Sequence, residues 1–583
     1  MHVKKEFTIS EDQENRSKDR IDFILLAWLL VAIVVAGRDF YIQVLRHTYY
    51  TDLADKQYIS TTSRNFERGN IYFSRYKAAI VPAAQLRTTY RIAVDPSQIT
   101  NPENLFKSIS SVIPLEKEAF MEKATKVNDP YEEVAKDISP EDVLLLKKKN
   151  LKGVTFVKDN KRSYPQDKVG AKIIGFVGSD GVNVRGQYGL ERYYDDVLTR
   201  KTNGITINFF AELFSDIKKT IVSNTDKQEG DIVLTIDAEA ERVLHQTLIE
   251  TKETWKSDTI GGIIMDPKTG RIIAMDALPT YDPNEFTEVK DSNSFINYNV
   301  SGVYEMGSII KPLTMAAALD AGVVDETKTT YNDTGFRGLN GYKVRNFDGK
   351  ARGPGVTMQT ILDKSLNIGI VFLVEQLGIK KFQTYFKKFG IGLETGIDLP
   401  TEASGLTDNL ESPVLVDNAT AGFGQGIAIT PIQTIRALAT LGNGGMLVSP
   451  HVVDSIVYQN GDVKKISFDE GEQVITPETS EIISRMLVHV VDNALKNGDY
   501  KMDRYTIAAK TGTAQMVKPG GGYYEDRYLH SFFGYFPAYE PKYIIFLFQT
   551  YPKGAEYASA TLTDPFFKIV KFLISYYEIP PDR

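Results

Sequence analysis

In the part of the chain after residue 230, the segments with strand-like composition fall into two groups, which lie on either side of a long block of helical character. The first group lies between residues 231 and 275 and contains DIVLTID, GGIIMD and RIIAM. The second group lies between residues 506 and 549 and contains TIAAKTGTAQ, SFFGYFPA and YIIFLFQ. Strands before and after a helical block fit a sheet that is flanked by helices. The sequence therefore predicts a domain of the α+β or mixed α/β class.

A domain boundary is expected before the first of these strands, because a chain of 583 residues is too long for one typical domain. The segment SNTDKQEG at 223–230 is polar and rich in turn-forming residues. The preceding residues 41–222 are more mixed: TTYRIAVDP, KIIGFVG and GITINFF are strand-like, whereas PEDVLLLKKKN is helical. We therefore expect one domain over 41–222 and a second over 223–583.

The composition excludes several classes of function. Lys and Arg number 68 against 75 Asp and Glu, so no basic excess points to nucleic acid. The absence of cysteine excludes disulfides, thiolate catalysis and thiolate metal sites. Six scattered histidines also argue against a histidine-rich metal site.

An uncharged apolar run, FILLAWLLVAIVVAG at 23–37, predicts a membrane anchor. A spanning helix needs about 20 residues, roughly 17 at the short end, so the predicted span extends over 21–40. A cleaved signal peptide is the alternative, since its apolar region of about 7 to 15 residues is followed by small residues. The tail 1–20 contains five basic side chains: Lys4, Lys5, Arg16, Lys18 and Arg20. Because basic residues favour the cytoplasmic side, we expect the N-terminus in the cytoplasm and the chain after the anchor outside.

The stretch YEMGSIIKP at 304–312 places Ser308 and Lys311 three residues apart at the expected start of a helix. Residues at i and i+3 share one helix face, with Cβ atoms about 5 to 6 Å apart. Lysine can deprotonate a serine only if burial or nearby positive charge lowers its pKa from about 10.4. Ser308 is therefore either a nucleophile with Lys311 as its base or an ordinary helix cap.

The Ser-x-x-Lys pattern alone carries little weight, because it also occurs at 74–77 and 215–218. Two further elements follow in order: Ser365-Leu366-Asn367 and Lys510-Thr511-Gly512-Thr513. Ser-x-x-Lys, a Ser-x-Asn-like element and Lys-Thr-Gly together are the signature of penicillin-binding proteins and serine β-lactamases.

Two partial copies of these elements are expected to be structural. Lys268-Thr269-Gly270 precedes Ser308 and lies where a hairpin turn is predicted. Ser63-Arg64-Asn65 lies in a charged stretch far from any candidate nucleophile. Only the set at 308, 365 and 510 has both the right order and suitable neighbours.

On these elements the sequence resembles the class B penicillin-binding proteins, which are membrane-anchored D,D-transpeptidases. Other segments that resemble the family are RGNI at 68–71, RSYP at 162–165, GQYGLERYYDD at 186–196, FGQGIAITPIQ and LGNGG. RGNI is followed by YFSRYKAAI instead of the family's acidic, arginine and glycine run. The resemblance implies a tail over 1–20, an anchor over 21–40, an elongated α+β pedestal over 41–222 and a transpeptidase domain over 223–583. It also implies that the sheet of the last domain is antiparallel and flanked by helices.

The resemblance further implies a role for each motif residue. Ser308 attacks the penultimate D-Ala of a stem peptide with Lys311 as base, and Ser365 relays a proton to the leaving amine. Asn367 holds the acyl side chain, while Lys510 and the segment Thr511, Gly512 and Thr513 bind the substrate carboxylate. The backbone N–H groups of Ser308 and Thr513 form the oxyanion hole. No metal and no cofactor is needed.

Within the family, the FtsI type, which builds the division septum, is preferred over the elongation type. The implied partners are peptidoglycan stem peptides, β-lactams as inhibitors, an FtsW-like glycosyltransferase, divisome proteins and the membrane, but not nucleic acid. A D,D-carboxypeptidase, a β-lactamase or a β-lactam sensor would keep the same motifs. The fused pedestal and anchor argue against the small hydrolases, and the short cytoplasmic tail argues against a sensor.

Overall fold

The computed structural model describes residues 28–35, 37–38, 41, 66–126, 129–179, 184–200, 229–466 and 471–583. The chain forms two compact units, one from residues 1–66 and 88–160 and the other from 67–87 and 161–583. Half of the predicted anchor at 21–40 lies outside the described residues, and all of GITINFF does. Within the described ranges, no helix is both long and apolar enough to cross a membrane. The predicted domain limits stay a prediction.

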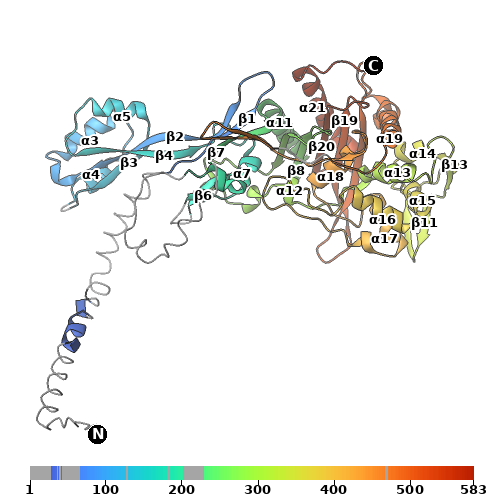
Figure 1. Cartoon of the computed structure of the whole chain (residues 1–583), viewed down its shortest axis with the longest axis horizontal. Coiled ribbons are helices and arrows are strands. Elements are labelled where there is room, and N and C mark those ends of the chain that lie inside the picture. Colours follow the sequence, from blue (N-terminus) through green and yellow to red (C-terminus); the bar gives the residue numbers. More distant parts are fainter. Residues whose placement is uncertain are drawn as a thin grey trace, which may run out of the picture. The chain divides into compact units, whose positions relative to one another are not determined.

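The unit that contains residues 88–160 is a small α+β body. Strand β2 (Val81–Val94) enters it and pairs antiparallel with β3 (Glu132–Ile138), with Ile92 opposite Ala135. Three helices, α3 (Pro102–Ser110), α4 (Lys117–Ala124) and α5 (Pro140–Lys147), and strand β4 (Val154–Ser163) belong to this part of the chain (Figure 1). Asn101 and Ser139 cap α3 and α5, each followed by the proline that favours a helix start. The helix predicted from PEDVLLLKKKN is therefore confirmed.

The segment KIIGFVG at 172–178, which we predicted as a strand, begins as a helical turn and is extended only at its end. Residues Ala171–Ile174 form the short helix α6, and only the end of the segment joins β5 (Val177–Ser179). Gly170 and Gly175 bound this turn with φ of 72° and 77°. All four residues of α6, Lys172 included, are buried, so the burial pattern has no periodicity that separates helix from strand.

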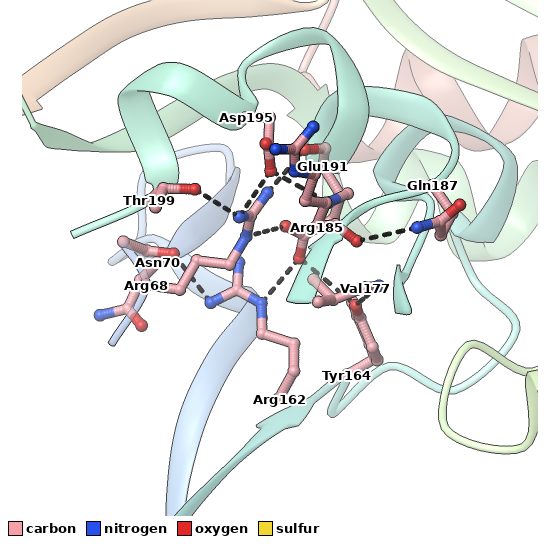
Figure 2. A network of polar contacts seen from close by, with 12 residues as sticks. Arg68, Asn70, Arg162, Tyr164, Val177, Arg185, Gln187, Glu191, Asp195 and Thr199 are labelled. Carbon is pink, nitrogen blue, oxygen red and sulfur yellow. Dashed lines mark hydrogen bonds and ion pairs between the residues drawn. The ribbon is translucent and has the colours of Figure 1, made fainter. Parts of the chain in front are cut away.

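The pedestal motifs of the sequence meet in one buried polar network (Figure 2). Glu191, in α7 (Gly189–Tyr193), is fully buried between two arginines, with Arg68 Nε at 2.5 Å and Arg162 Nε at 2.7 Å from its carboxylate oxygens. Arg68 also contacts Asp195 at 2.8 Å, in α8 (Asp195–Leu198). RGNI, RSYP and GQYGLERYYDD therefore form a single interacting cluster.

A first sheet of the larger unit joins this network to the C-terminal half of the chain. Strand β1 (Ile71–Ser74) pairs antiparallel with the start of β2 and parallel with β7 (Gly230–Asp237). Strand β7 in turn pairs antiparallel with β15 (Val453–Tyr458), which pairs with β16 (Val463–Lys465). The strand predicted from DIVLTID is confirmed as β7.

The second sheet contains five strands in the order β18, β19, β20, β8, β9, and each neighbouring pair is antiparallel. Their bounds are Ala508–Val517, Tyr523–Phe536, Tyr543–Thr550, Thr259–Met265 and Ile272–Leu278. Strand β20 lies beside β8, with Phe546 opposite Ile263, so the late and early strand groups join at the centre. The predicted antiparallel sheet built from both groups is confirmed.

Helices cover both faces of this sheet. Alternate strand residues point to opposite faces. Ile264 and Leu547 belong to a core with helices α11 (Ala238–Trp255) and α21 (Thr563–Tyr576). Ile263 and Phe546 belong to the other core, which contains α13 (Lys311–Asp320) and α18 (Pro431–Ala439).

The helical block between the strand groups supplies the remaining walls of the site. Its short helix η5 (Gly307–Ile310) packs against β18, and α13 packs against helices of the same block. Its other elements are α12 (Tyr298–Ser301), β10 (Thr330–Asp333), β11 (Phe336–Leu339), β12 (Tyr342–Arg345), β13 (Gly353–Thr357), α14 (Met358–Asp363), α15 (Asn367–Leu377), α16 (Ile379–Lys388), α17 (Leu415–Gly422), α19 (Pro477–His489), η7 (Val490–Ala494) and η8 (Leu495–Gly498).

Candidate active site

The three sequence motifs meet at one cleft with a volume of about 1090 Å³. Most of the predicted site residues line it: Ser308, Ser365, Asn367, Lys510, Thr511 and Thr513. Lys311 is only 1 % exposed and Gly512 is buried, and both lie behind this lining. Within the described ranges, no group of three or more His, Asp or Glu side chains is arranged to hold a metal ion.

Ser308 lies in the single turn η5, one turn before α13 begins at Lys311. The sequence predicted one helix from Ser308, whereas the structure has a tighter 3₁₀ turn first and the α-helix second. The residues at the N-cap positions are Met306 for η5 and Ile310 for α13, and neither helix has a side-chain cap. The alternative that Ser308 is a helix cap is therefore wrong, and its side chain lines the cleft instead.

Glycines bring three backbone segments together around Ser308. Gly307 has a φ of 65°, and its N–H donates to the carbonyl oxygen of Gly424 at 2.9 Å. A Cβ on Gly424 would lie 2.2 Å from the carbonyl oxygen of Gly307. A Cβ on Gly512 would lie 2.8 Å from the carbonyl oxygen of Met306. Only residues without a side chain allow this approach. Gly512 therefore positions β18 against η5.

The Ser365 hydroxyl lies between two amines. The Nζ of Lys311 donates to the carbonyl oxygen of Ser365 at 2.5 Å and contacts its Oγ at 3.1 Å. The Nζ of Lys510 donates to the same Oγ at 3.3 Å and to the carbonyl oxygen of Thr511 at 3.0 Å. Ser365 has a φ of 51°, an uncommon value for a residue with a side chain. The structure thus holds the loop between α14 and α15 in a conformation that presents both oxygens of Ser365.

Burial and mutual repulsion act on the two lysines. Burial, together with the charge of Lys510, lowers the pKa of Lys311 well below its ordinary value. Burial lowers the pKa of Lys510 to about 8, while the carboxylate of Asp363 opposes that shift. An amine with a strongly lowered pKa is neutral near pH 7. Lys311 therefore meets the electrostatic requirement for a base.

The remaining motif residues take up defined places on the cleft wall. Thr511, Thr513 and Gln515 alternate along β18 and line the cleft together. The Oγ1 of Thr513 accepts a hydrogen bond from the N–H of Ala558 at 3.1 Å. Asn367 begins α15, and its Nδ2 donates to the carbonyl oxygen of Arg345 at 2.9 Å.

Glu305 is a residue of the site region that the sequence reasoning missed. Its Oε1 accepts hydrogen bonds from the N–H of Gly426 at 2.9 Å and the hydroxyl of Tyr523 at 3.1 Å. Gly426 and Tyr523 line the cleft, and burial raises the pKa of Glu305. Glu305 therefore joins the segment of Ser308 to two separate parts of the wall. Its position three residues before Ser308 was the only signal in the sequence.

The partial motif copies that the structure describes lie outside the cleft lining and are structural. Lys268-Thr269-Gly270 lies in the hairpin turn between β8 and β9, where Gly270 has a φ of 78°. The Oγ of Ser74 donates to the carbonyl oxygens of Thr235 and Ile236. The copies at 63–65 and 215–218 lie outside the described residues.

Comparisons with known proteins agree with this arrangement. The family model for the penicillin-binding protein transpeptidase domain matches residues 260–570, and that for the penicillin-binding protein dimerisation domain matches 63–234. The stage V sporulation protein D of Bacillus subtilis is 31% identical over 94% of this chain and 84% of its own. The peptidoglycan D,D-transpeptidase FtsI of Escherichia coli is 27% identical over 77% of this chain and 73% of its own.

The fold agrees with a solved structure of the same kind. The crystal structure of penicillin-binding protein 2X from Streptococcus thermophilus has a TM-score of 0.74 at 19% identity, covering 88% of this chain and 80% of the other. Likeness at this identity shows the fold, and the two family models show the family. The chain therefore belongs to the class B penicillin-binding proteins, the serine transpeptidases in which a dimerisation domain precedes the transpeptidase domain.

Proposed function

We propose that this chain crosslinks peptidoglycan stem peptides through an acyl-enzyme on Ser308. The observation that supports this most directly is the pair of buried amines, Lys311 and Lys510, that share the Ser365 hydroxyl beside the cleft. Within the described part of the chain, Lys311 has no carboxylate partner, so its buried amine is best accommodated without charge. A neutral amine one helical turn from a serine can act as its base.

In the acylation half of this reaction, the Oγ of Ser308 attacks the carbonyl carbon of the penultimate D-Ala. The Nζ of Lys311 takes the hydroxyl proton as the new ester bond forms. The C–N bond to the terminal D-Ala then breaks, and the Ser365 hydroxyl passes a proton from Lys311 to the leaving amine. The bond between Lys311 and Ser365 Oγ at 3.1 Å provides the path for that proton.

The other motif residues hold the donor peptide. Lys510, Thr511 and Thr513 bind the terminal carboxylate, and the bond between Asn367 and Arg345 fixes the amide that holds the acyl chain. The backbone N–H groups of Ser308 and Thr513 stabilise the oxyanion, each by roughly 3 to 4 kcal/mol. Gly512 makes no substrate contact in this scheme, since its role is to let β18 approach η5.

In the second half, an amine of a neighbouring stem peptide attacks the ester carbonyl. The amine loses a proton to Lys311, the ester C–O bond breaks, and Ser308 recovers its proton. β-Lactams enter the same site and acylate Ser308, because their strained amide takes the place of the D-Ala-D-Ala bond. The chain's own residues supply every step of this scheme.

We place this activity at the outer face of the cytoplasmic membrane, with residues 21–40 as the anchor and 1–20 inside. The proposed cellular role is peptidoglycan synthesis at the division septum, and the name of the FtsI relative supports this role. The proposed partners are an FtsW-like glycosyltransferase and divisome proteins. The name of the Bacillus subtilis relative assigns that protein to sporulation, which makes cell-wall synthesis during sporulation the second candidate. A fluorescent fusion imaged in dividing and in sporulating cells distinguishes them.

The chemical proposal is tested by incubating the full chain in detergent with a labelled penicillin and locating the adduct by mass spectrometry. A stable adduct on the peptide that contains Ser308 is expected, and it should be absent from Ser308→Ala. Ser559→Ala is the matched control, because Ser559 also lines the cleft but belongs to no motif. An adduct elsewhere, or one retained in Ser308→Ala, would overturn the assignment. Rapid loss of the adduct would instead indicate a β-lactamase.

A further inference from the structure

The cleft carries an excess of positive charge, although the chain as a whole has a net charge of −7. Asp363, Asp417 and Glu556 are the acidic side chains on its wall. Twice as many cationic side chains line it: Lys343, Arg345, Arg352, Lys364, Lys496 and Lys510. A cleft lined with one sign of charge attracts ligands of the opposite sign.

Only some of these cations have partners in the protein. Arg352 forms an ion pair with Asp348 at 2.7 Å, and Lys343 lies 3.8 Å from the ring centre of Phe336. Within the described ranges, the side chains of three of these cations have no hydrogen bond, ion pair or contact with an aromatic ring, and all three are exposed: Arg345, Lys364 and Lys496. These three are therefore available to a ligand.

Lys364 and Lys496 lie at the end of the cleft where Lys510 is found. Lys364 directly precedes Ser365, whose hydroxyl accepts the hydrogen bond from Lys510. Lys496 follows η7, which packs against both α14 and β18. The neighbouring acid, Asp363, accepts a hydrogen bond from Gln359 at 2.8 Å and contacts His489 at 3.1 Å. Asp363 therefore has other partners and leaves the two lysines open.

We propose that Lys364 and Lys496 bind the α-carboxylate of the residue that precedes the amine-bearing residue of the acyl-acceptor stem peptide. This inference rests on the proposed transpeptidation. The attacking amine must reach the ester carbonyl along the path by which the leaving amine departed, because the second half-reaction reverses the geometry of the first. The leaving D-Ala carries the carboxylate that Lys510 binds, so the acceptor chain enters at that same end of the cleft. An acceptor with a free carboxyl group next to its amine-bearing residue gains two charge contacts there.

The test compares two acceptors that differ in one group, with the full chain in detergent and an N-acyl-D-Ala thioglycolate thioester as acyl donor. The acceptors are L-Ala-γ-D-Glu-L-Lys-D-Ala, with a free α-carboxyl on its D-Glu, and the same peptide with that carboxyl amidated. The readout is the ratio of their kcat/KM values for formation of the new amide. Two exposed charge contacts predict a preference of about threefold to tenfold for the free carboxylate near 0.1 M salt. The preference should fall towards one near 1 M salt.

Variants assign this preference to the two lysines. Lys364→Ala with Lys496→Ala should bring the ratio close to one, and Lys364→Glu with Lys496→Glu should reverse it. Lys381→Ala, an exposed lysine of α16 away from the cleft, should keep the native preference. The yield of penicillin adduct on each protein gives its fraction of competent sites, and the rates are normalised by it.

The inference is overturned if the native chain transfers to both acceptors equally, or if the double alanine variant keeps the preference. An equal loss of rate with both acceptors in the double alanine variant would also overturn the inference, because the lysines would then act on a group that the two peptides share. Absence of any penicillin adduct on the native chain is a different result: it refutes the proposed function and leaves no acyl-enzyme for an acceptor to attack.

Discussion

Replacing Lys510 by methionine should shift the pH range in which Ser308 reacts. The positive charge of Lys510 is one of the two causes that lower the pKa of Lys311, burial being the larger. Methionine keeps the apolar stem but removes the charge, so the pKa of Lys311 should rise. A larger share of Lys311 would then be protonated at neutral pH and unable to take the proton of Ser308.

The structure gives the size of this effect. Both amines contact the same Ser365 Oγ, at 3.1 and 3.3 Å, so their nitrogens are at most about 6.4 Å apart. With an effective dielectric constant of about 20, two unit charges at that separation repel each other by about 2.6 kcal/mol. Removal of this repulsion should therefore raise the pKa of Lys311. The charge is present below pH 8, because burial lowers the pKa of Lys510 to about 8.

The assay is the second-order rate of penicillin acylation measured as a function of pH, in native protein and in Lys510→Met. The rate rises with pH as Lys311 loses its proton, and this rise should move to higher pH in the variant. Loss of the carboxylate contact of Lys510 lowers the rate at every pH without moving the rise. The two roles of Lys510 therefore separate in one experiment.

A rise that stays at the native pH, or moves downwards, would refute the view that Lys510 tunes Lys311. Lys381→Met provides the matched control, because it removes an exposed charge from α16 and should leave the profile unchanged. Asp363→Asn provides a check of sign. The carboxylate of Asp363 raises the pKa of Lys510, so its removal should leave Lys510 less often charged near pH 7. The pKa of Lys311 should then be lowered less, so the rise should move slightly upwards, in the same direction as with Lys510→Met but by a smaller amount.

Two further predictions concern the framework around the site. Gly512→Ala should place a methyl group 2.8 Å from the carbonyl oxygen of Met306 and so destabilise the fold by about 1 to 3 kcal/mol. The rate of penicillin labelling should fall at least tenfold, and labelling at the native rate would refute the packing role of Gly512. Glu191→Gln should leave Arg162 without its carboxylate partner and lower the free energy of unfolding by about 3 kcal/mol. Urea unfolding transitions measure this loss, with Glu540→Gln, at an exposed residue, as control. Equal urea midpoints for the two variants would contradict the network in Figure 2.

The sheet was predictable because its strands are strongly apolar and its turns have clear signals. Helix α11, from Ala238 to Trp255, likewise begins at a clear local signal, the capping side chain of Asp237. The segment KIIGFVG was not predictable in the same way, because full burial removes the alternation that distinguishes a strand from a helical turn. The two glycines at its ends were the useful signal.

The site was predictable from the order of its motifs, whereas its geometry was not. The sequence placed Ser308 at the start of an α-helix, but the structure gives Ser308 its own turn, η5, before Lys311 begins α13. That turn is held by contacts from residues far along the chain. The Oγ of Ser531 donates to the carbonyl oxygen of Met306 at 2.8 Å, and Gly307 bonds to Gly424. Local preferences around residue 308 contain no information about these partners.

The two Lys-Thr-Gly segments show why the pattern alone is ambiguous. Gly270 adopts a φ of 78°, so the turn between β8 and β9 itself favours glycine there. Gly512 lies in strand β18, with a backbone that any residue could adopt, and a Cβ is excluded by Met306 and Ser531. The same tripeptide therefore has a local cause in one place and a long-range cause in the other. Because Met306 lies two residues before Ser308, the long-range cause connects Gly512 to the nucleophile. The Lys-Thr-Gly segment at 510–512 consequently belongs to the site, and the one at 268–270 does not.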